Sequence, residues 1–404
     1  MSKWVCTTLG EIVSSGGGKI QTGPFGSQLH AADYVEVGIP CIMPANMKNN
    51  RVDLTDIKSI SENDAKRLSQ HLVKAGDIVY SRRGDITQKA LIRKTEAGYF
   101  CGTGCLLIRP GANIDPEFLT YHLSAPSNIS WIINQAVGAT MPNLNTSILS
   151  KAPLSVPNKT TQQKIAAVLS AFDAKIELNN HINAELEAMA KTLYNYWFVQ
   201  FDFPDKNGKP YKSSGGKMVW NKELKREIPA GWDSVTINQL LTKESATNKI
   251  SSSDILLEGS IPIIDQSTDY IAGYTNDESS RIKCEVPRII FGDHTRILKL
   301  INFDFARGAD GTQTMLSNSV RMPQCLFYHT MLKIDLSNYG YARHYKFLKD
   351  QRIILPDESI AQKYNGLAHT YYELIRQNIF ENQHLSSLRD WLLPMLMNGQ
   401  VKVS

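Results

Sequence analysis

Two stretches of the chain carry the apolar pattern of long amphipathic helices. In the first stretch, apolar residues recur at alternating spacings of three and four, as in the seam of a coiled coil. The seam is interrupted by the polar residues Asn179 and Asn183. The pattern predicts a helix of about 38 residues, roughly 57 Å long, which is a spacer or an assembly surface and not a globular core. Its apolar positions are Ile165, Leu169, Phe172, Ile176, Leu186, Ala190, Leu193 and Trp197.

The second stretch repeats the first. Residues 149–198 align without a gap with residues 348–397, a register of 199 residues. The asparagine pair recurs as Asn378 and Asn382, and the proline that opens the helix recurs as well. Buried asparagines in such a seam fix register and orientation, whereas the simpler alternative is that they face solvent. The residues predicted to pair the two helices are Leu169, Phe172, Ile176, Asn179, Asn183, Leu186, Leu193, Tyr371, Ile375, Asn378, Asn382, Leu385 and Leu392.

The segments in front of the two helices also resemble each other. Trp4 and Thr8 align with Trp232 and Thr236, and each helix follows a short strand-like run (APLSVP, RIILP). Short β-branched runs broken by Gly, Pro and Asn predict β-rich globular domains with a few helices. We therefore predict an α+β fold in which two mixed β-rich domains are separated by two long antiparallel coiled-coil helices with pseudo-two-fold symmetry. The predicted parts are a first domain (1–150), a central helix (151–200), a connector (201–230), a second domain (231–345) and a distal helix (346–404).

Composition excludes several classes of protein. A chain of 404 residues suggests two or three domains, and no apolar run approaches the roughly 18 residues of a membrane span. The start of the sequence is unlike a signal peptide, and six cysteines without CxxC pairs favour a reducing, cytoplasmic location. The net charge is only +5, and no segment has the heavy basic excess of a free-standing DNA-binding protein.

Motifs of catalysis are missing from the sequence. It contains no P-loop, G-x-S-x-G elbow, H-E-x-x-H helix or NPPY-like methyltransferase segment. Asp77 with Asp85, or Asp293 with His294, could form an acid–base pair, but neither pair has a third partner.

Polar clusters typical of DNA recognition are more numerous. Arg82 and Arg83 end a strand in the first domain, and His294, Thr295 and Arg296 follow the matching strand in the second. Arginine and glutamine read base edges, and glycine-rich loops bring backbone amides close to phosphates. For any single residue the alternative is a solvated turn. The predicted DNA-binding residues are Lys19, Gln21, Thr22, Ser27, Gln28, Asn46, Lys48, Arg82, Arg83, Gln88, Asn143, Gln266, His294, Thr295, Arg296, Arg307, Thr312 and Gln313.

Several motifs of the sequence resemble those of a known family. Two features are similar to specificity subunits of type I restriction–modification enzymes. One is the start of each long helix, where a proline is followed by a Gln-Lys pair (Pro157 with Gln163-Lys164, and Pro356 with Gln362-Lys363). The other is the connector FDFPDKNGKPYKSSGGKMVW. The GPFGS loop and the GDIVYSRRGD and FGDHTR segments resemble the target recognition domains of that family. The second copy lacks the QQKIAAVLSAFD run of the first, so its contact with a partner is expected to be weaker or different.

The resemblance implies a non-catalytic subunit. Each target recognition domain would read one half of a bipartite site in double-stranded DNA, and the helices would fix the unread spacer. Two adenine methyltransferase subunits would grip the helices, and restriction subunits would complete the nuclease. We expect no cofactor in this chain, with S-adenosylmethionine and ATP with magnesium on the partner subunits. The alternatives are a non-catalytic protein–protein scaffold, or the specificity part of a fused methyltransferase–nuclease.

Overall fold

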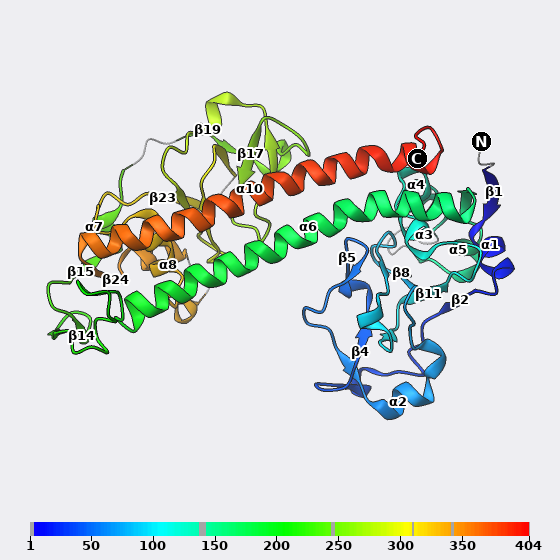
Figure 1. Cartoon of the computed structure of the whole chain (residues 1–404), viewed down its shortest axis with the longest axis horizontal. Coiled ribbons are helices and arrows are strands. Elements are labelled where there is room, and N and C mark those ends of the chain that lie inside the picture. The colour runs from blue at the N-terminus through cyan, green and yellow to red at the C-terminus, as the bar shows by residue number, and fades with distance from the viewer. Residues whose placement is uncertain (1–3, 137–142, 244–246, 309–310, 341–342, 404) are drawn as a thin grey trace. The chain divides into compact units, whose positions relative to one another are not determined.

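A computed structural model divides the chain into two compact units, whose elements are labelled in Figure 1. The structure describes residues 4–136, 143–243, 247–308, 311–340 and 343–403. Unit 1 comprises Met1–Glu177 and Gln383–Ser404, and unit 2 comprises Leu178–Asn382. Each unit combines short strands with helices around buried apolar residues, which confirms the predicted mixed α+β class. The five-part division of the chain remains a prediction.

Unit 1 is built on two four-stranded sheets. One has the order β2-β11-β8-β9 and the other β10-β4-β7-β3. In the first, Leu106 of β11 lies opposite Thr22 of β2 and Tyr80 of β8, and both pairings are antiparallel. Its strands are β2 (Lys19–Thr22), β8 (Ile78–Ser81), β9 (Lys89–Leu91) and β11 (Cys105–Arg109). The others of unit 1 are β1 (Val5–Thr8), β3 (Tyr34–Val35), β4 (Ile39–Ile42), β5 (Met47–Lys48), β6 (Arg51–Val52), β7 (Ser59–Ile60), β10 (Phe100–Cys101) and β12 (Pro153–Val156).

Unit 2 is also built on two sheets. A five-stranded sheet has the order β16-β22-β17-β18 with β19 on β22, and a three-stranded sheet has the order β21-β20-β23. In the latter, Ile290 of β20 lies opposite Lys299 of β21 and Thr314 of β23. The strands of the two sheets are β16 (Lys249–Ile250), β17 (Ile261–Ile264), β18 (Gly273–Thr275), β19 (Arg281–Ile282), β20 (Arg288–Gly292), β21 (Leu298–Ile301), β22 (Phe305–Gly308) and β23 (Thr312–Met315). The remaining strands of unit 2 are β13 (Met218–Asn221), β14 (Arg226–Pro229), β15 (Asp233–Thr236) and β24 (Arg352–Leu355).

The short helices begin where capping residues place them. Thr8 and Glu11 form a capping box at the start of α1, and Thr236 and Gln239 form the same box at α7, so two free backbone amides are satisfied at each helix start. The short helices are α1 (Leu9–Ser15), α2 (Glu62–Arg67), α3 (Pro116–His122), α4 (Pro126–Gln135), α5 (Thr146–Ser150), α7 (Ile237–Leu240), α8 (Gln324–Met331) and α9 (His344–Lys349).

Each unit contains an equivalent antiparallel strand pair that precedes its long helix. In unit 1, β1 pairs antiparallel with β12, which puts Val5 opposite Val156. In unit 2, β15 pairs antiparallel with β24, which puts Asp233 opposite Leu355. The two strands predicted in front of the long helices are therefore present, and each joins the start of its own unit to the long helix that follows.

The two long helices are α6 (Lys159–Tyr194, 36 residues) and α10 (Glu358–Met397, 40 residues), close to the predicted length. A π-helical turn over Asn195–Val199 follows α6. The side chain of Asn158 accepts a hydrogen bond from the amide of Thr161, and Asp357 accepts one from Ser359, so the two helices start on matched caps.

Each unit has a core to which both long helices contribute. In unit 1, Ile165 and Leu169 of α6 share a buried cluster with Leu396 of α10. In unit 2, the Tyr364 hydroxyl of α10 donates to the carbonyl of Ala190 of α6 at 3.2 Å. Among the described residues, no helix is long and apolar enough to span a membrane.

The residues predicted to pair the helices fall into two groups. Leu169, Asn179 and Ile375 are buried, while Leu186, Leu193, Phe172, Ile176, Tyr371, Leu385 and Leu392 are partly buried together with Asn183, Asn378 and Asn382. One position differs from the alignment, because α10 buries Tyr372 more deeply than Tyr371. Met189 and Leu388, which align as an apolar column, are 50% and 48% exposed.

The asparagines of the two helices bind each other within unit 2. Asn378 donates from Nδ2 to Oδ1 of Asn183 at 2.8 Å, and Asn179 donates to Oδ1 of Asn382 at 2.9 Å. Asn179 is fully buried. The alternative that these asparagines only face solvent is therefore wrong.

The connector is an ordered part of unit 2. Phe203 stacks on Tyr211 with ring centroids 4.6 Å apart, and on Trp232 at 5.0 Å. The carboxylate of Asp202 accepts hydrogen bonds from the amide and hydroxyl of Ser213. Aromatic stacking and side-chain hydrogen bonds thus order a segment rich in glycine, serine and lysine.

Candidate nucleic-acid interface

In unit 1, the end of β8 brings together several of the predicted DNA-binding residues. Arg82 Nε donates to Oδ1 of Asn143 at 3.3 Å, and its guanidinium lies 6.0 Å from the ring centroid of Phe25. Arg83 forms an isolated β-bridge with Asn143 and is exposed. The aromatic ring and the amide orient Arg82 in advance, which lowers the entropy that a contact with DNA would cost.

The other candidates of unit 1 are spread over several elements, and most of them make local contacts. Their partners are protein groups: Gln21 donates to the carbonyl of Gln70 at 2.6 Å, and Gln28 accepts from the amide of Phe25 at 3.0 Å. Gln88 donates to Asp85 and Lys48 pairs with Asp53, whose pKa the Lys48 hydrogen bond holds below its usual range. Lys19 and Ser27 are exposed and Thr22 is half-buried.

Two of the predicted DNA-binding residues are buried in the structure. Asn46 is only 7% exposed, and its side chain accepts from the amide of Met43 and donates to the carbonyl of Asp53. Thr312 is fully buried on β23. Both belong to the interior of their unit, so neither side chain is placed to reach a nucleic acid.

In unit 2, a loop cluster gathers after β20. The side-chain oxygen of Gln266 accepts from the amide of His294 at 3.2 Å, and its carbonyl accepts from the Thr295 hydroxyl at 2.8 Å. Gly311 passes directly beneath: with φ at +86°, a Cβ there would lie 2.7 Å from Nε2 of Gln266. Arg296 is exposed and adopts a left-handed conformation with φ at 63°. Glycine at 311 therefore permits the close packing that holds Gln266 beside His294.

A second feature of unit 2 was not predicted. A cleft of about 710 Å³ is lined by six basic residues and, among the residues that the structure describes, by no carboxylate. Arg307 and Gln313 in this cleft were predicted from the sequence, whereas the other five basic residues were missed. The lining residues are Asn238, Leu241, Thr242, Lys243, Thr247, Arg281, Ile282, Lys283, Arg288, Arg307, Gln313, Thr314, Tyr345 and Lys349.

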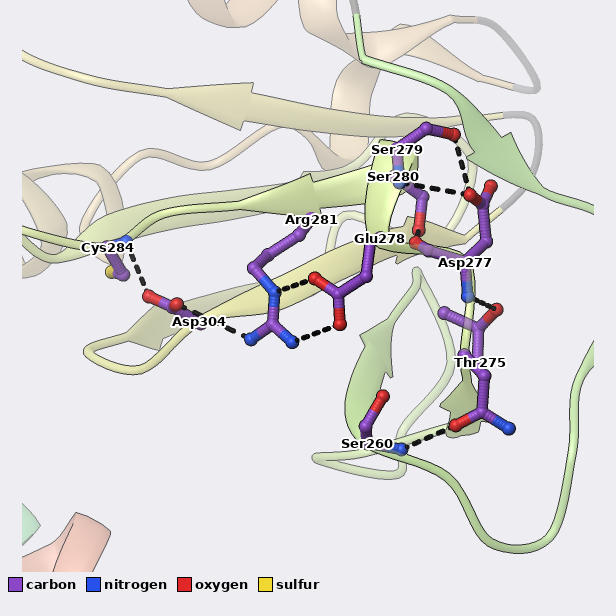
Figure 2. Close-up of polar contacts among 10 residues, drawn as sticks. Ser260, Thr275, Asp277, Glu278, Ser279, Ser280, Arg281, Cys284 and Asp304 are labelled. Carbon is purple, nitrogen blue, oxygen red and sulfur yellow. Dashed lines mark hydrogen bonds and ion pairs between the residues drawn. The ribbon is translucent and has the colours of Figure 1, made fainter.

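One of the six cations is neutralised where it stands. Figure 2 shows Arg281 between Glu278 and Asp304: its guanidinium donates to both oxygens of Glu278 at 2.7 and 2.8 Å, and lies 3.5 Å from Asp304. The amide of Cys284 in turn donates to Asp304 at 2.9 Å. Hydrogen bonds from Arg281 hold the pKa of Glu278 below its usual value. Arg281 therefore braces the rim of the cleft and adds little to its net charge.

Other cations of the cleft contact neutral groups. Arg288 donates to the carbonyl of Val286 at 2.8 Å, and Arg307 to that of Thr247 at 3.4 Å. Nε of Arg307 is buried and makes no hydrogen bond. Lys349 lies 4.9 Å from the ring centroid of Tyr345. The carbonyl contact of Arg307 and the aromatic contact of Lys349 do not cancel the charges of these two side chains.

The net charge of the sequence segment around this cleft gives no sign of its positive lining. Residues 231–345 contain 11 basic and 13 acidic side chains, a net charge of −2. Five of those 11 basic residues line the cleft, and none of the acidic residues that the structure describes in this segment does. Local clustering therefore creates a positive surface within a segment whose total charge is negative.

The candidate acid–base pairs have structural roles. Both carboxylate oxygens of Asp77 accept hydrogen bonds from Arg109, at 2.8 and 2.6 Å, and Asp77 is only 2% exposed. Asp293 accepts from the amide of Tyr345 at 2.8 Å. Across the described ranges, no group of three or more His, Cys, Asp or Glu residues is arranged to hold a metal ion.

Two β-rich units with arginine- and glutamine-bearing loops and a basic cleft are features typical of nucleic-acid-recognition proteins. A family model described as "Type I restriction modification DNA specificity domain" matches residues 1–188. The specificity subunit of the type I restriction enzyme MjaIX from Methanocaldococcus jannaschii is 26% identical over 394 residues, which cover 92% of this chain and 88% of that protein. The HindI specificity subunit from Haemophilus influenzae is 32% identical over 165 residues, 40% of this chain and 36% of that protein.

A solved structure shares the fold. The crystal structure of a type I restriction–modification S subunit from M. genitalium aligns with a TM-score of 0.58 at 16% identity, over 98% of this chain and 96% of that chain. Residues 1–188 thus match the type I DNA specificity domain, and over most of its length the chain is similar to specificity subunits of type I restriction enzymes. Specificity subunits of this kind are non-catalytic recognition subunits.

Proposed function

We propose that this chain selects the DNA sequence on which a type I restriction–modification complex acts, and that its two β-rich domains read the two halves of a bipartite site. The observation that carries the proposal is that the two units share one structural motif but present different polar surfaces. The strand pairs β1–β12 and β15–β24 are alike, yet the polar surfaces differ. Unit 1 presents Arg82 beside Phe25, whereas unit 2 presents a loop cluster and a basic cleft. Two similar units with unlike surfaces suit two different half-sites.

We further propose that α6 and α10 pair as an antiparallel coiled coil with pseudo-two-fold symmetry. In the repeat, Asn179 corresponds to Asn378, and Asn183 to Asn382. The hydrogen bonds run crosswise, from Asn179 to Asn382 and from Asn378 to Asn183. Such reciprocal contacts are what a two-fold axis generates, because residue i meets j and the copy of j meets the copy of i. A rigid helix pair of this kind would keep the unread spacer constant.

The partners proposed are two adenine methyltransferase subunits that grip the helices, and restriction subunits that join them. Support comes from large apolar side chains left exposed on the helices, since such residues mark protein contacts. Trp391 is 63% exposed. The other such residues are Leu178, Ile182 and Met189 on α6, and Leu367, Leu374 and Leu388 on α10. S-adenosylmethionine, and ATP with magnesium, would be bound by these partners, in the cytoplasm where six free thiols would stay reduced.

The proposal is tested by mapping methylated adenines in genomic DNA. The methyltransferase partner is expressed in a host free of adenine methylation, with and without this chain. We expect methylation at one bipartite motif only when the chain is present. Methylation of the same motif without the chain would contradict the proposal.

A further inference from the structure

A second pocket of unit 2, separate from the basic cleft, lies where the end of α6 meets α8, β24 and the β13–β14 hairpin. Its volume is about 300 Å³, at the lower end of the range of small-molecule sites. The floor is buried and mostly apolar. Its buried lining residues are Tyr194, Phe198, Met322, Leu326, Thr330, Ile353 and Pro356.

Two hydroxyl groups are the polar part of this floor. The hydroxyl of Tyr194 donates to that of Thr330 at 3.4 Å, and the Thr330 hydroxyl donates to the carbonyl of Leu326 at 2.8 Å. Both hydroxyls are therefore engaged with protein groups, and the floor favours an apolar ligand surface. Pockets for small molecules commonly have such a lining, mostly apolar with a few polar groups.

Part of the wall is formed by the π-helical turn Asn195–Val199, which contributes Phe198 and Val199. A π turn holds more residues than a turn of α-helix, so these two side chains leave the directions that a continued α6 would give them. Phe198 lies edge-on to Tyr364, with ring centroids 5.2 Å apart, and Val199 is 43% exposed. Single π turns joined to α-helices are frequent at functional sites.

Three cationic side chains stand at the mouth of the pocket. Arg226, Lys333 and Arg352 line it and are exposed. Arg352 is paired with the carboxylate of Glu223, so its charge is balanced. The guanidinium of Arg226 instead lies 4.9 Å from the ring centroid of Phe201, a contact that orients the cation without balancing its charge. The mouth therefore favours an anionic group, above a floor that favours an apolar one.

We propose that this pocket binds a small amphipathic carboxylate, whose apolar body lies on the buried floor and whose acid group meets Arg226 and Lys333. The apolar body supplies affinity by burial, and the charge selects an acid over an amine. Because the pocket joins α6, α8, β24 and the hairpin, the ligand stabilises unit 2 where these elements meet. The inference goes beyond the proposed function, and its test requires no DNA.

The test is calorimetric titration of the full chain, alone and in complex with its methyltransferase partner. The probe is octanoate, compared with octylammonium, which has the same apolar body and the opposite charge. We expect saturable binding of octanoate in both samples and much weaker binding of octylammonium. Octanoate should also raise the unfolding temperature of the chain as its concentration increases.

Two variants change the pocket at exposed positions, where folding is preserved. Arg226→Gln/Lys333→Gln removes the two charges at the mouth and should weaken octanoate binding about fivefold, while improving octylammonium binding relative to it. Val199→Trp places an indole at the mouth and should abolish binding of octanoate. The matched control is Lys217→Gln/Lys222→Gln, because these exposed lysines flank β13 outside the pocket, and it should bind octanoate as the wild type does.

Three results would overturn the inference. Equal binding of octanoate and octylammonium would show that charge plays no part. Unchanged octanoate binding in both pocket variants would place the ligand on another apolar surface of the chain. Loss of octanoate binding when the methyltransferase is added would identify the pocket as a protein contact and not a small-molecule site.

Discussion

Asn378 on α10 donates a hydrogen bond to Asn183 on α6, with 2.8 Å between Nδ2 and Oδ1. Both residues are predicted seam positions, and each is the repeat partner of a residue in the neighbouring pair, Asn179 with Asn382. Asparagine side chains in a helix seam give less stability than leucine would, but they stabilise only the register in which their hydrogen bonds form. These asparagine hydrogen bonds therefore fix the register of α6 against α10, because a shift of either helix along the other would break them.

The first prediction concerns this pair of asparagines. We expect Asn183→Ala and Asn378→Ala each to lower the free energy of unfolding by about 1–2 kcal/mol, because each leaves a partly buried amide without its partner. The double variant should lose less than the sum, with a coupling of about 1 kcal/mol. Denaturant unfolding of the four proteins measures this coupling. Asn183→Ala combined with Asn338→Ala, an exposed residue elsewhere in unit 2, should be additive. Additivity of Asn183 with Asn378 would show that the hydrogen bond adds nothing.

The second prediction concerns buried histidine. Burial lowers the pKa of His329 from 6.5 to about 4, so its imidazole is neutral where Tyr372 meets its Nε2 at 2.9 Å. Because the folded pKa lies below the unfolded one, the unfolded chain binds more protons in this window. The free energy of unfolding should therefore fall as the pH drops from 6.5 towards 4, by up to about 1.4 kcal/mol per pH unit from this group.

Substitution isolates the contribution of that histidine. His329→Gln keeps a hydrogen-bonding side chain but should flatten the dependence of stability on pH by that amount. His384→Gln, at an exposed position on α10, serves as the control and should leave the dependence unchanged. A steep dependence that survives in His329→Gln would assign the effect to other groups, of which His122 in unit 1, also with a pKa lowered to about 4 by burial, is the first to test.

The third prediction concerns Arg82. If this guanidinium reads a guanine, Arg82→Ala should cost about 1–3 kcal/mol at one base pair and relax the motif at that position. Methylation mapping with the variant reveals the relaxed position directly. Arg67→Ala is the control, since Arg67 is exposed on α2 and pairs with Asp64 at 2.7 Å. An unchanged motif with Arg82→Ala would mean that Arg82 contacts only phosphate or protein.

The sequence predicted the long helices and the strands before them because their signals are local. An apolar period of three and four and a repeated proline entry require no knowledge of distant residues. The alignment erred by one position in α10, where Tyr372 is buried more deeply than Tyr371. Only the packing of α10 against α8 decides between them, since the hydroxyl of Tyr372 reaches His329.

The basic cleft could not be predicted in the same way. Lys243, Lys283 and Lys349 are far apart in sequence, and only the sheets of unit 2 and helix α9 bring them to one surface. Conversely, Asn46 was predicted to bind DNA because asparagine is common in recognition loops. Its amide instead satisfies the backbone of Met43 and Asp53, a role that depends on the fold of the loop. Residue type indicates the chemistry, whereas burial decides whether a ligand can reach it.

The fourth prediction concerns the proposed grip on the helices. Trp391 and Leu388 are 63% and 48% exposed, so Trp391→Ser/Leu388→Ser should leave the chain folded. Because burial of each side chain in an interface would contribute about 1.5–3 kcal/mol, affinity for the methyltransferase should fall by at least about tenfold. Titration of the two purified proteins measures it. Leu257→Ser, at a 96% exposed position in unit 2, is the control. Equal affinities for all three proteins would place the methyltransferase contact elsewhere.

The most direct measurement is the methylated motif of a domain exchange. Residues 231–345 are replaced by the corresponding domain of another specificity subunit, with α6 and α10 left intact, and methylated adenines are mapped genome-wide. We predict that one half of the motif changes, while the half read by residues 1–150 and the length of the unread spacer stay as in the wild type. A change in both halves would contradict the claim that the two β-rich domains of this chain read separate half-sites.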